Sequence, residues 1–307
     1  MNTIESKLTG VWPALLTPVD KNGSPDYEQL RKLVEVLIAE GLDGLYILGS
    51  TGQGFLFDEA ERTRITAAVM EAAAARVPVI AQVGALNTHE SVRLAKEAQK
   101  LGVFGISTVA PIYYPSGGGR GMEHYRAIAS SVSIPFFPYH IGNNSIFGGE
   151  ARPYIESLLQ LPNICGMKLT TQNLYEISLM HVLSEGRLKL FSGADELLCQ
   201  GAMCGTVGAI GSFYNIWGAE CRKVRAAFLA GDIELGTKFM FAFQEAIHHV
   251  LPNAWSFFDQ ALKLKYDIEL GIPNPPLGFC QSPWDENEVL ALLKKVENAA
   301  NGIDSAH

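Results

Sequence analysis

Lys168 is the residue whose setting most clearly suggests chemistry, because it stands inside a short apolar run that ends in hydroxyl residues. The run reads ICGMKLTT over residues 164–171. A charged ammonium is expensive to bury, and a lysine that faces a core commonly has a lowered pKa. The neutral amine can then attack a ketone and form a Schiff base. The ordinary alternative is a lysine at the rim, with its stem along apolar surface and its charged head in water.

The stretch around Lys168 is one of eight apolar segments that alternate with helical patterns. Their ranges are 11–19, 44–50, 77–84, 104–111, 134–141, 164–171, 188–193 and 206–212. Their apolar residues run continuously and do not alternate with polar ones, as is typical of strands that are covered on both faces. One of the helices begins at Asp58 with Glu61 three residues later, the spacing of a capping box. Eight such βα units over about 230 residues predict an α/β fold of the (β/α)8 TIM barrel type.

Two further observations bear on the architecture. A doubly wound sheet is the alternative fold, but no GxGxxG or Walker sequence follows any of the apolar segments. After residue 231 the strand pattern stops, and helices are predicted at 234–251, 254–269 and 286–300. We therefore expect a catalytic barrel over 1–230 and a C-terminal helical extension over 231–307.

The composition argues against several classes of function. The chain has 307 residues and a net charge of -8, which disfavours binding to nucleic acid or to anionic membrane surfaces. The five cysteines lack CxxC spacing, and the histidines show no metal-ligand spacing on one face. The first ten residues carry no visible secretory signal. We therefore expect a cytoplasmic protein with reduced thiols and no metal site.

One uncharged stretch, residues 197–219, is long enough to span a bilayer. It contains glycines at positions 201, 205, 208, 211 and 218, which would interrupt a continuous helix. The stretch is therefore predicted to form a helix, a buried strand and a second helix within the α/β protein. No membrane partner is expected.

In a barrel of this type the active site gathers at the carboxyl ends of the strands. Residues at those ends are Thr17, Ser50, Thr51, Tyr113, Tyr139, Lys168, Thr170, Gly193, Asp195, Glu196 and Ser212. Lys168 would then not be a rim residue. Tyr139 would lie one strand away, close enough to exchange a proton with an intermediate on Lys168, although a core position is the commoner fate of a tyrosine. His140 points to the other side of its strand and is expected to be structural.

The turn Gly49-Ser50-Thr51-Gly52 joins a predicted strand to a helix. Exposed amides at such a turn, together with two hydroxyl groups, suit a carboxylate or a phosphate. An ordinary connection between a strand and a helix is the alternative interpretation.

Six ordered segments carry a resemblance to a known family. They are GSTG at 49–52, APIYYP at 110–115, YHI at 139–141, GMKLT at 166–170, FSGADE at 191–196 and GAIGSFYN at 208–215. Over essentially its whole length the chain resembles the Schiff-base class I aldolases, the family of N-acetylneuraminate lyase and dihydrodipicolinate synthase. The resemblance implies a (β/α)8 barrel with a helical extension, usually a homotetramer, that needs no cofactor beyond a covalent lysine imine with its 2-oxo acid substrate.

The resemblance also implies roles for individual residues. Lys168 is similar to the imine-forming lysine, Tyr139 to the tyrosine that relays protons, and Tyr113 to a tyrosine donated into a neighbouring subunit's site. Other positions resemble substrate-binding positions of the family: Ser50, Thr51 and the backbone of Ile210 toward the carboxylate, and Thr170, Gly193, Asp195, Glu196 and Ser212 toward the sugar chain. The implied reaction is the cleavage of N-acetylneuraminate, or a related 2-oxo sugar acid, to pyruvate and an aldehyde sugar.

Three departures from the family pattern leave alternatives open. Gln53 stands where the GxTGE signature has glutamate. Gly142 replaces the proline that usually follows the YxI segment of the sialate lyases, and Asn143, Asn144 and Ser145 stand where the synthase branch places an arginine. A synthase role is therefore not expected. A 2-keto-3-deoxy sugar acid aldolase or dehydratase is the alternative enzyme, and a non-catalytic barrel that binds a sugar acid is the alternative outside enzymes.

Overall fold

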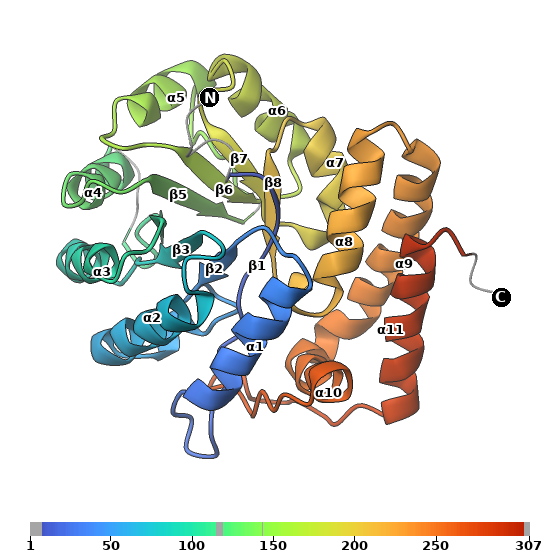
Figure 1. Cartoon of the computed structure of the whole chain (residues 1–307). Coiled ribbons are helices and arrows are strands. Elements are labelled where there is room, and N and C mark those ends of the chain that lie inside the picture. The colour runs from blue at the N-terminus through green and yellow to red at the C-terminus, as the bar shows by residue number, and fades with distance from the viewer. Residues whose placement is uncertain (1–7, 115–118, 143, 304–307) are drawn as a thin grey trace.

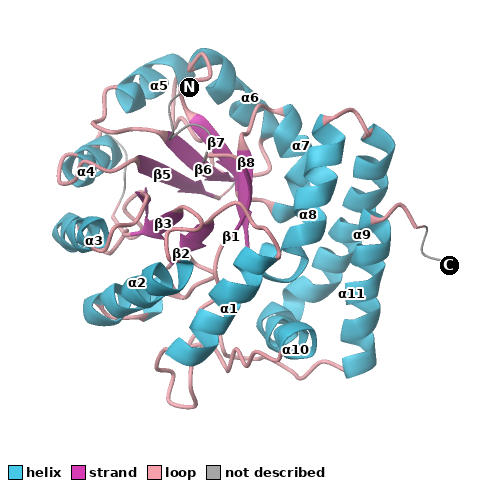
Figure 2. Cartoon of the chain, in the orientation of Figure 1, coloured by secondary structure: helices cyan, strands magenta, loops and turns pink. Residues whose placement is uncertain are grey.

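Eight parallel strands form the centre of the molecule (Figures 1 and 2). The computed structural model describes residues 8–114, 119–142 and 144–303. The strands are β1 (Gly10–Pro13), β2 (Leu45–Ile47), β3 (Val79–Gln82), β4 (Gly105–Val109), β5 (Phe136–Ile141), β6 (Gly166–Thr170), β7 (Lys189–Ser192) and β8 (Gly208–Gly211). Their hydrogen-bonded order is β1-β8-β7-β6-β5-β4-β3-β2. A single parallel bridge between Ala14 and Tyr46 brings β2 to β1, so the sheet forms the predicted (β/α)8 barrel.

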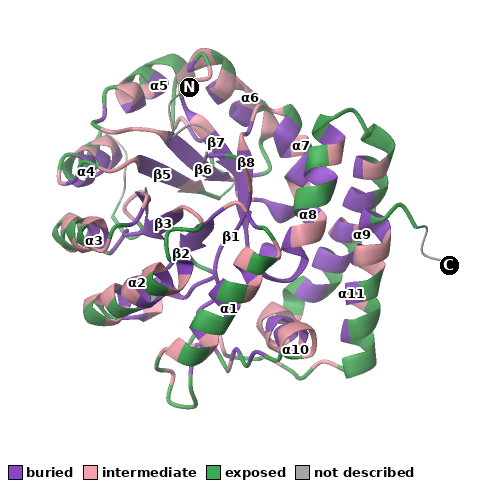
Figure 3. Ribbon diagram, in the orientation of Figure 1, coloured by how far each residue is buried: buried purple, intermediate pink, exposed green. Residues whose placement is uncertain are grey.

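One helix follows each strand and covers the outside of the barrel (Figure 2). These helices are α1 (Tyr27–Ala39), α2 (Glu59–Ala73), α3 (Thr88–Lys100), α4 (Arg120–Ala129), α5 (Ala151–Leu159), α6 (Leu174–Leu183), α7 (Leu198–Met203) and α8 (Tyr214–Leu229). The predicted capping box is present, because the Asp58 side chain accepts from the Glu61 amide and Glu61 accepts from the Asp58 amide. Burial alternates around the helices, with exposed outer faces and buried inner faces (Figure 3).

The uncharged stretch 197–219 divides as predicted into α7, β8 and the first part of α8. Within the described part of the chain, no helix combines the length and the apolar character needed to cross a membrane.

Three further helices pack beside α8 on one side of the barrel (Figure 1). They are α9 (Ile233–Val250), α10 (Ala254–Tyr266) and α11 (Glu286–Ala300). Buried aromatic rings join them to the barrel, and the ring centroids of Trp217 and Phe257 are 5.4 Å apart. The prediction extended α10 to residue 269, which is wrong. The helix ends at Tyr266 because Asp267 takes a left-handed conformation, after which Ile268 is buried in the core.

The interior of the barrel is filled with side chains. Trp12, Tyr46, Phe137, Phe191 and Ile210 belong to one cluster of buried residues, separate from the larger core between strands and helices. The ring of Phe191 lies 5.3 Å from that of Trp12 and 6.3 Å from that of Phe137. This packing closes the inside of the barrel to solvent and gives the residues near the carboxyl ends of the strands a rigid apolar floor.

Candidate active site

Lys168 is buried inside the barrel and is not a rim residue. It lies in β6, and its residue is 6% exposed. The Nζ atom lies 4.3 Å from the centroid of the Tyr139 ring and 4.5 Å from that of the Tyr46 ring. The side chain is therefore fixed by packing, and the amine is held between two phenol rings inside the barrel.

Tyr139 is held beside Lys168 by the backbone. The two residues are opposed in the parallel pairing of β5 with β6. The Tyr139 hydroxyl lies 3.1 Å from the Oγ1 atom of Thr170, and either group can donate. Lys168, Tyr139 and Thr170 therefore form one polar cluster near the carboxyl end of β6.

Gly193 gives this cluster room. A Cβ atom on Gly193 would lie 2.0 Å from the Oγ1 atom of Thr170 and 3.1 Å from the Cε atom of Lys168. No other residue type fits at this position without displacing one of these two side chains. The structure thus places Gly193 against the cluster, through the space that its missing side chain leaves.

Tyr46 belongs to the same site, although no motif in the sequence pointed to it. It is 1% exposed, and its hydroxyl donates to the Ser107 hydroxyl at 3.1 Å. Burial raises the pKa of Tyr46 well above the ordinary value, so the phenol stays protonated. The signal was a polar aromatic residue in the middle of an otherwise aliphatic strand, the pattern expected of an inward-facing barrel residue with a partner.

The turn after β2 is fixed to the ends of two other strands. The Thr51 hydroxyl lies 2.6 Å from the Ser212 hydroxyl, which follows β8. The Thr17 hydroxyl, which follows β1, donates to the carbonyl of Gly52 at 2.9 Å. Thr51 is buried, whereas Ser50 is exposed. The structure therefore brings Ser50, Thr51 and Ser212 to the same end of the barrel as Lys168, as the sequence predicted.

Asp195 is an unusual carboxylate at the end of β7. It is 5% exposed, and its Oδ2 atom accepts from the Phe213 amide at 2.8 Å. Its Oδ1 atom has no hydrogen-bond partner among the residues that the structure describes. Burial raises the pKa of Asp195 to about 7, and the hydrogen bond from the Phe213 amide opposes that shift in part. A Cβ atom on Gly211 would lie 1.4 Å from Oδ1, so the carboxylate also requires glycine there.

The remaining predicted residues lie in different surroundings. Glu196 is partly buried, and its backbone carbonyl accepts from the Gln244 side chain at 2.7 Å. Ile210 is 1% exposed, and its side chain is part of the barrel floor. Tyr113 follows β4, is 81% exposed in the single chain and packs edge-on against Tyr114 at 5.3 Å. Among the described residues, the aromatic rings that the structure places against the Lys168 amine are those of Tyr46 and Tyr139, and that of Tyr113 is not one of them. Pro115, the last residue of the APIYYP segment, lies outside the described residues.

The segment after β5 is anchored to α6. Glu176 is buried, and its two carboxylate oxygens accept from the Ser145 hydroxyl and the Ile146 amide, each at 2.7 Å. Ile146 itself is buried in the core. His140 is partly buried, and burial lowers its pKa, which is compatible with the structural role predicted for it. Asn143 lies outside the described residues.

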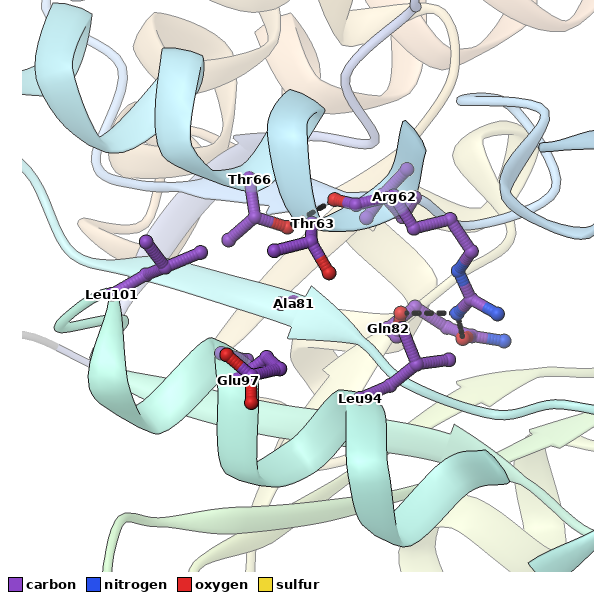
Figure 4. A pocket seen from close by; sticks show the side chains of 10 residues that line it. Arg62, Thr63, Thr66, Ala81, Gln82, Leu94, Glu97 and Leu101 are labelled. Atoms are coloured by element: carbon purple, nitrogen blue, oxygen red, sulfur yellow. Dashed lines mark hydrogen bonds between the residues drawn. The ribbon is translucent and has the colours of Figure 1, made fainter. Parts of the chain in front are cut away.

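Two cavities lie elsewhere and include none of the predicted site residues. Figure 4 shows the smaller one, between α2, α3 and β3, with a volume of about 10 Å³. That is room for about one water molecule. Beside it, Arg62 is buried and donates to the backbone of Gln82 and Gly84. The larger cavity, of about 390 Å³, lies at the amino ends of β1 to β4, away from the end where barrel enzymes place their sites.

The described residues hold no group of three histidine, cysteine, aspartate or glutamate side chains that could bind a metal ion. The polar groups described above are instead the amine of Lys168, the phenols of Tyr46 and Tyr139, and the hydroxyl groups of Thr51, Thr170 and Ser212.

Comparison with known proteins identifies the family of this chain. A sequence model described as the Dihydrodipicolinate synthetase family matches residues 7–263. The N-acetylneuraminate lyase of Citrobacter koseri is 39% identical over 228 residues, which cover 74% of this chain and 76% of that protein. The N-acetylneuraminate lyase of Escherichia coli is 36% identical over 235 residues, which cover 76% and 78%. The chain belongs to the dihydrodipicolinate synthetase family.

Solved structures agree with this membership. The wild-type sialic acid aldolase of Ruminococcus gnavus superposes with a TM-score of 0.87 at 26% identity, covering 97% of this chain and 99% of that one. The N-acetylneuraminate lyase of Aliivibrio salmonicida superposes with a TM-score of 0.83 at 26% identity, with coverages of 97% and 99%. The resemblance found in the sequence is confirmed. The chain is an enzyme, a carbon–carbon lyase of the class I aldolase type, and not a non-catalytic binding protein.

Proposed function

We propose that this member of the family cleaves N-acetylneuraminate, or a closely related 2-oxo sugar acid, to pyruvate and an aldehyde sugar. The observation that carries the proposal is the buried amine of Lys168, held within 4.3 Å of the Tyr139 ring centroid near the end of β6. It is supported by the relatives from Citrobacter koseri and Escherichia coli, whose names state a lyase acting on N-acetylneuraminate.

The chemistry begins with attack of the Lys168 amine on the C2 ketone. Loss of water gives a protonated imine, which withdraws electrons from the C3–C4 bond. When that bond breaks, the C4 hydroxyl loses its proton and becomes an aldehyde, while the bonding electrons form an enamine at C2 and C3. Protonation of C3 and addition of water to the imine then release pyruvate and restore the lysine. The imine supplies the electron sink, so the proposed reaction calls for no metal or other cofactor.

Tyr139 is the group that we assign to the proton transfers. Its hydroxyl already shares a hydrogen bond with Thr170, so it can accept or donate a proton without leaving its position. Ser50 and Thr51 would bind the carboxylate of the 2-oxo acid, with the Thr51 hydroxyl oriented by Ser212.

The sugar chain would extend along the ends of β6, β7 and β8. Thr170, Asp195, Glu196 and Ser212 lie at these ends, and Asp195 offers a buried oxygen that has no hydrogen-bond partner among the described residues. A hydroxyl group of the substrate would satisfy that oxygen. Gly193 contributes space, and the Ile210 backbone is the remaining predicted contact with the carboxylate.

We also propose that the active form is a homotetramer and that Tyr113 enters a neighbouring subunit's site. The exposure of Tyr113 supports this, as do the exposed apolar side chains that flank it, Ile112 and Tyr114. A cytoplasmic location is part of the same proposal, supported by five cysteines that are all unpaired.

A second candidate substrate is a 2-keto-3-deoxy sugar acid. It is favoured by the loop after β5, which departs from the sialate lyase pattern at Gly142 and which Glu176 holds through Ser145 and Ile146. Because the Ser145 hydroxyl is already bound to Glu176, and because residues 144–147 include no cation, dihydrodipicolinate synthesis is less favoured than either aldolase reaction.

The test is a pyruvate assay on separate substrates. Wild-type protein and Lys168→Ala are incubated with N-acetylneuraminate and with a panel of 2-keto-3-deoxy sugar acids, and pyruvate is measured through a coupled dehydrogenase. We expect pyruvate from N-acetylneuraminate with the wild type and none above background with Lys168→Ala. Turnover of the deoxy acids alone would favour the second candidate, and no turnover of any 2-oxo acid would reject both.

A further inference from the structure

Gln53 closes the turn that contains Ser50, Thr51 and Gly52. Gln53 is only 1% exposed, and its backbone is left-handed, with a φ of 57°. A residue with a side chain is uncommon in this conformation and is retained only where its surroundings hold it there. Gln53 is therefore expected to be held in this conformation by the contacts of its side-chain amide.

Both polar atoms of the Gln53 side-chain amide form hydrogen bonds, one as a donor and the other as an acceptor. The Nε2 atom donates to the Thr17 carbonyl at 3.1 Å, and the Oε1 atom accepts from the Asn274 amide at 2.7 Å. Both partners are backbone groups that do not titrate. A carbonyl must face a donor and an amide N–H must face an acceptor, so the orientation of the Gln53 side chain is fixed by its partners. An ionised carboxylate has no hydrogen to donate and could satisfy only one of them.

These two bonds join three parts of the molecule at the turn. Thr17, which receives the bond from Gln53, in turn donates from its hydroxyl to the Gly52 carbonyl at 2.9 Å. The backbone N–H of Gln53 also donates to the Ser50 carbonyl at 3.1 Å. On the other side, Asn274 belongs to the C-terminal extension and donates from its side chain to the Gly23 carbonyl at 2.9 Å. Hydrogen bonds thereby hold the turn between the loop that follows β1 and the C-terminal extension.

We propose that Gln53 is a positioning residue, whose neutral amide couples the docked C-terminal extension to the turn that binds the substrate carboxylate. This inference rests on the proposed function, because it takes the turn to be the carboxylate-binding element. It assigns the extension a part in substrate binding: the segment around Asn274 sets the position of Ser50 and Thr51 through one buried amide.

The test replaces Gln53 by a side chain of the same shape. Gln53→Glu can donate to the Thr17 carbonyl only while protonated, and burial beside that carbonyl raises the pKa of the introduced carboxyl. We expect its KM for the 2-oxo acid to be within about threefold of wild type near pH 6 and about tenfold higher near pH 8.5. The binding of pyruvate, followed by borohydride trapping on Lys168, should change in parallel.

Two further variants make the result specific. Gln53→Met removes both hydrogen bonds without adding a charge, so its KM should be raised at both pH values. Gln29→Glu is the matched control, because the Gln29 Oε1 atom only accepts, from the Glu269 amide of the same extension at 3.0 Å. A carboxylate keeps that acceptor, and its pH profile should follow that of the wild type.

The outcomes separate the inference from the proposed function. If wild-type protein traps pyruvate on Lys168 but Gln53→Glu and Gln53→Met bind it as the wild type does, the positioning role is wrong and the function stands. If the wild type traps no pyruvate, the proposed function fails and the inference falls with it. Should Gln53→Glu unfold near pH 8.5, Gln53→Met decides: a raised KM supports the role and a wild-type KM overturns it.

Discussion

The Nζ atom of Lys168 lies 4.3 Å from the centre of the Tyr139 ring, and the two residues are direct partners in the pairing of β5 with β6. Their proximity is therefore set by a backbone ladder and not by a loop. Side chains on neighbouring parallel strands keep this relationship as long as the sheet is intact, which gives the amine and the phenol a fixed geometry before substrate binds.

Replacing Tyr139 by phenylalanine should separate imine formation from bond cleavage. The ring would still pack against Lys168, but the hydroxyl shared with Thr170 would be gone. We expect kcat for sugar acid cleavage to fall by about 10² to 10⁴, the usual contribution of a positioned acid or base, while pyruvate is still trapped on Lys168. Tyr125→Phe, which removes a hydroxyl from a buried tyrosine on α4, is the control. If kcat of Tyr139→Phe stayed within a few-fold of the wild-type value, the Tyr139 hydroxyl would not take part in the proton transfers.

Gly193→Ala should disturb the site through its close neighbours. The new Cβ atom would lie 2.0 Å from the Oγ1 atom of Thr170 and 3.1 Å from the Cε atom of Lys168. We expect a loss of about 1–3 kcal/mol in the free energy of unfolding together with lower activity, because two packed side chains must move. Gly149→Ala is the control, since nothing lies within 4 Å of its added Cβ atom. Denaturant unfolding measures the free energy of unfolding, and the pyruvate assay measures the activity. If Gly193→Ala and Gly149→Ala gave equal values in both measurements, the predicted crowding around Gly193 would be wrong.

Asp195→Asn should make stability less dependent on pH. The folded protein favours the protonated form of Asp195, because burial raises its pKa from 3.8 to about 7. Ionisation of Asp195 therefore costs stability as pH rises from about 4 to about 7, and the cost is constant above that range. The variant avoids this cost, so its stability relative to wild type should rise across the same range by at most roughly 4 kcal/mol.

The measurement is urea unfolding at fixed protein concentration, near pH 5 and near pH 8. Asp285→Asn is the matched control, because it removes the same charge from an exposed N-cap at the start of α11. If the advantage of Asp195→Asn over wild type were the same at both pH values, Asp195 would titrate in its ordinary range.

Tyr113 should act across a subunit interface. We expect Tyr113→Phe and Lys168→Ala to be each nearly inactive when expressed alone. Co-expression should restore up to about a quarter of the wild-type rate if paired subunits exchange Tyr113 through a two-fold interface, because half of the pairs are mixed and each mixed pair has one complete site. Sedimentation gives the oligomeric state. A rate no higher than the sum of the two inactive variants would show that Tyr113 does not act in trans.

Much of the architecture could be predicted because it depends on local patterns. Largely apolar segments separated by helical patterns indicated the barrel, and the residues Asp58 and Glu61 indicated the start of α2. The parallel order of the strands then placed Tyr139 beside Lys168, because neighbours in sequence are neighbours in the barrel. The bounds of α11 agree with the prediction for the same reason, since its capping residue and its apolar stripe are local.

Other features depend on contacts between distant segments and left little trace in the sequence. The end of α10 is set by a left-handed Asp267 followed by burial of Ile268. Tyr46 lies against Lys168, 122 positions away in the chain, so its role follows only from the closed barrel. The amide of Gln53 is explained by its partner Asn274 in the extension, which no local pattern connects to it.

The central claim is that the Lys168 amine forms an imine with a 2-oxo acid, and trapping tests it most directly. Wild-type protein is incubated with pyruvate, reduced with borohydride, digested and mapped by mass spectrometry, with Lys168→Ala treated in parallel. We predict a single reduced adduct on the peptide that contains Lys168 and none in the variant. An adduct on another lysine, or the absence of any adduct at saturating pyruvate, would contradict the account.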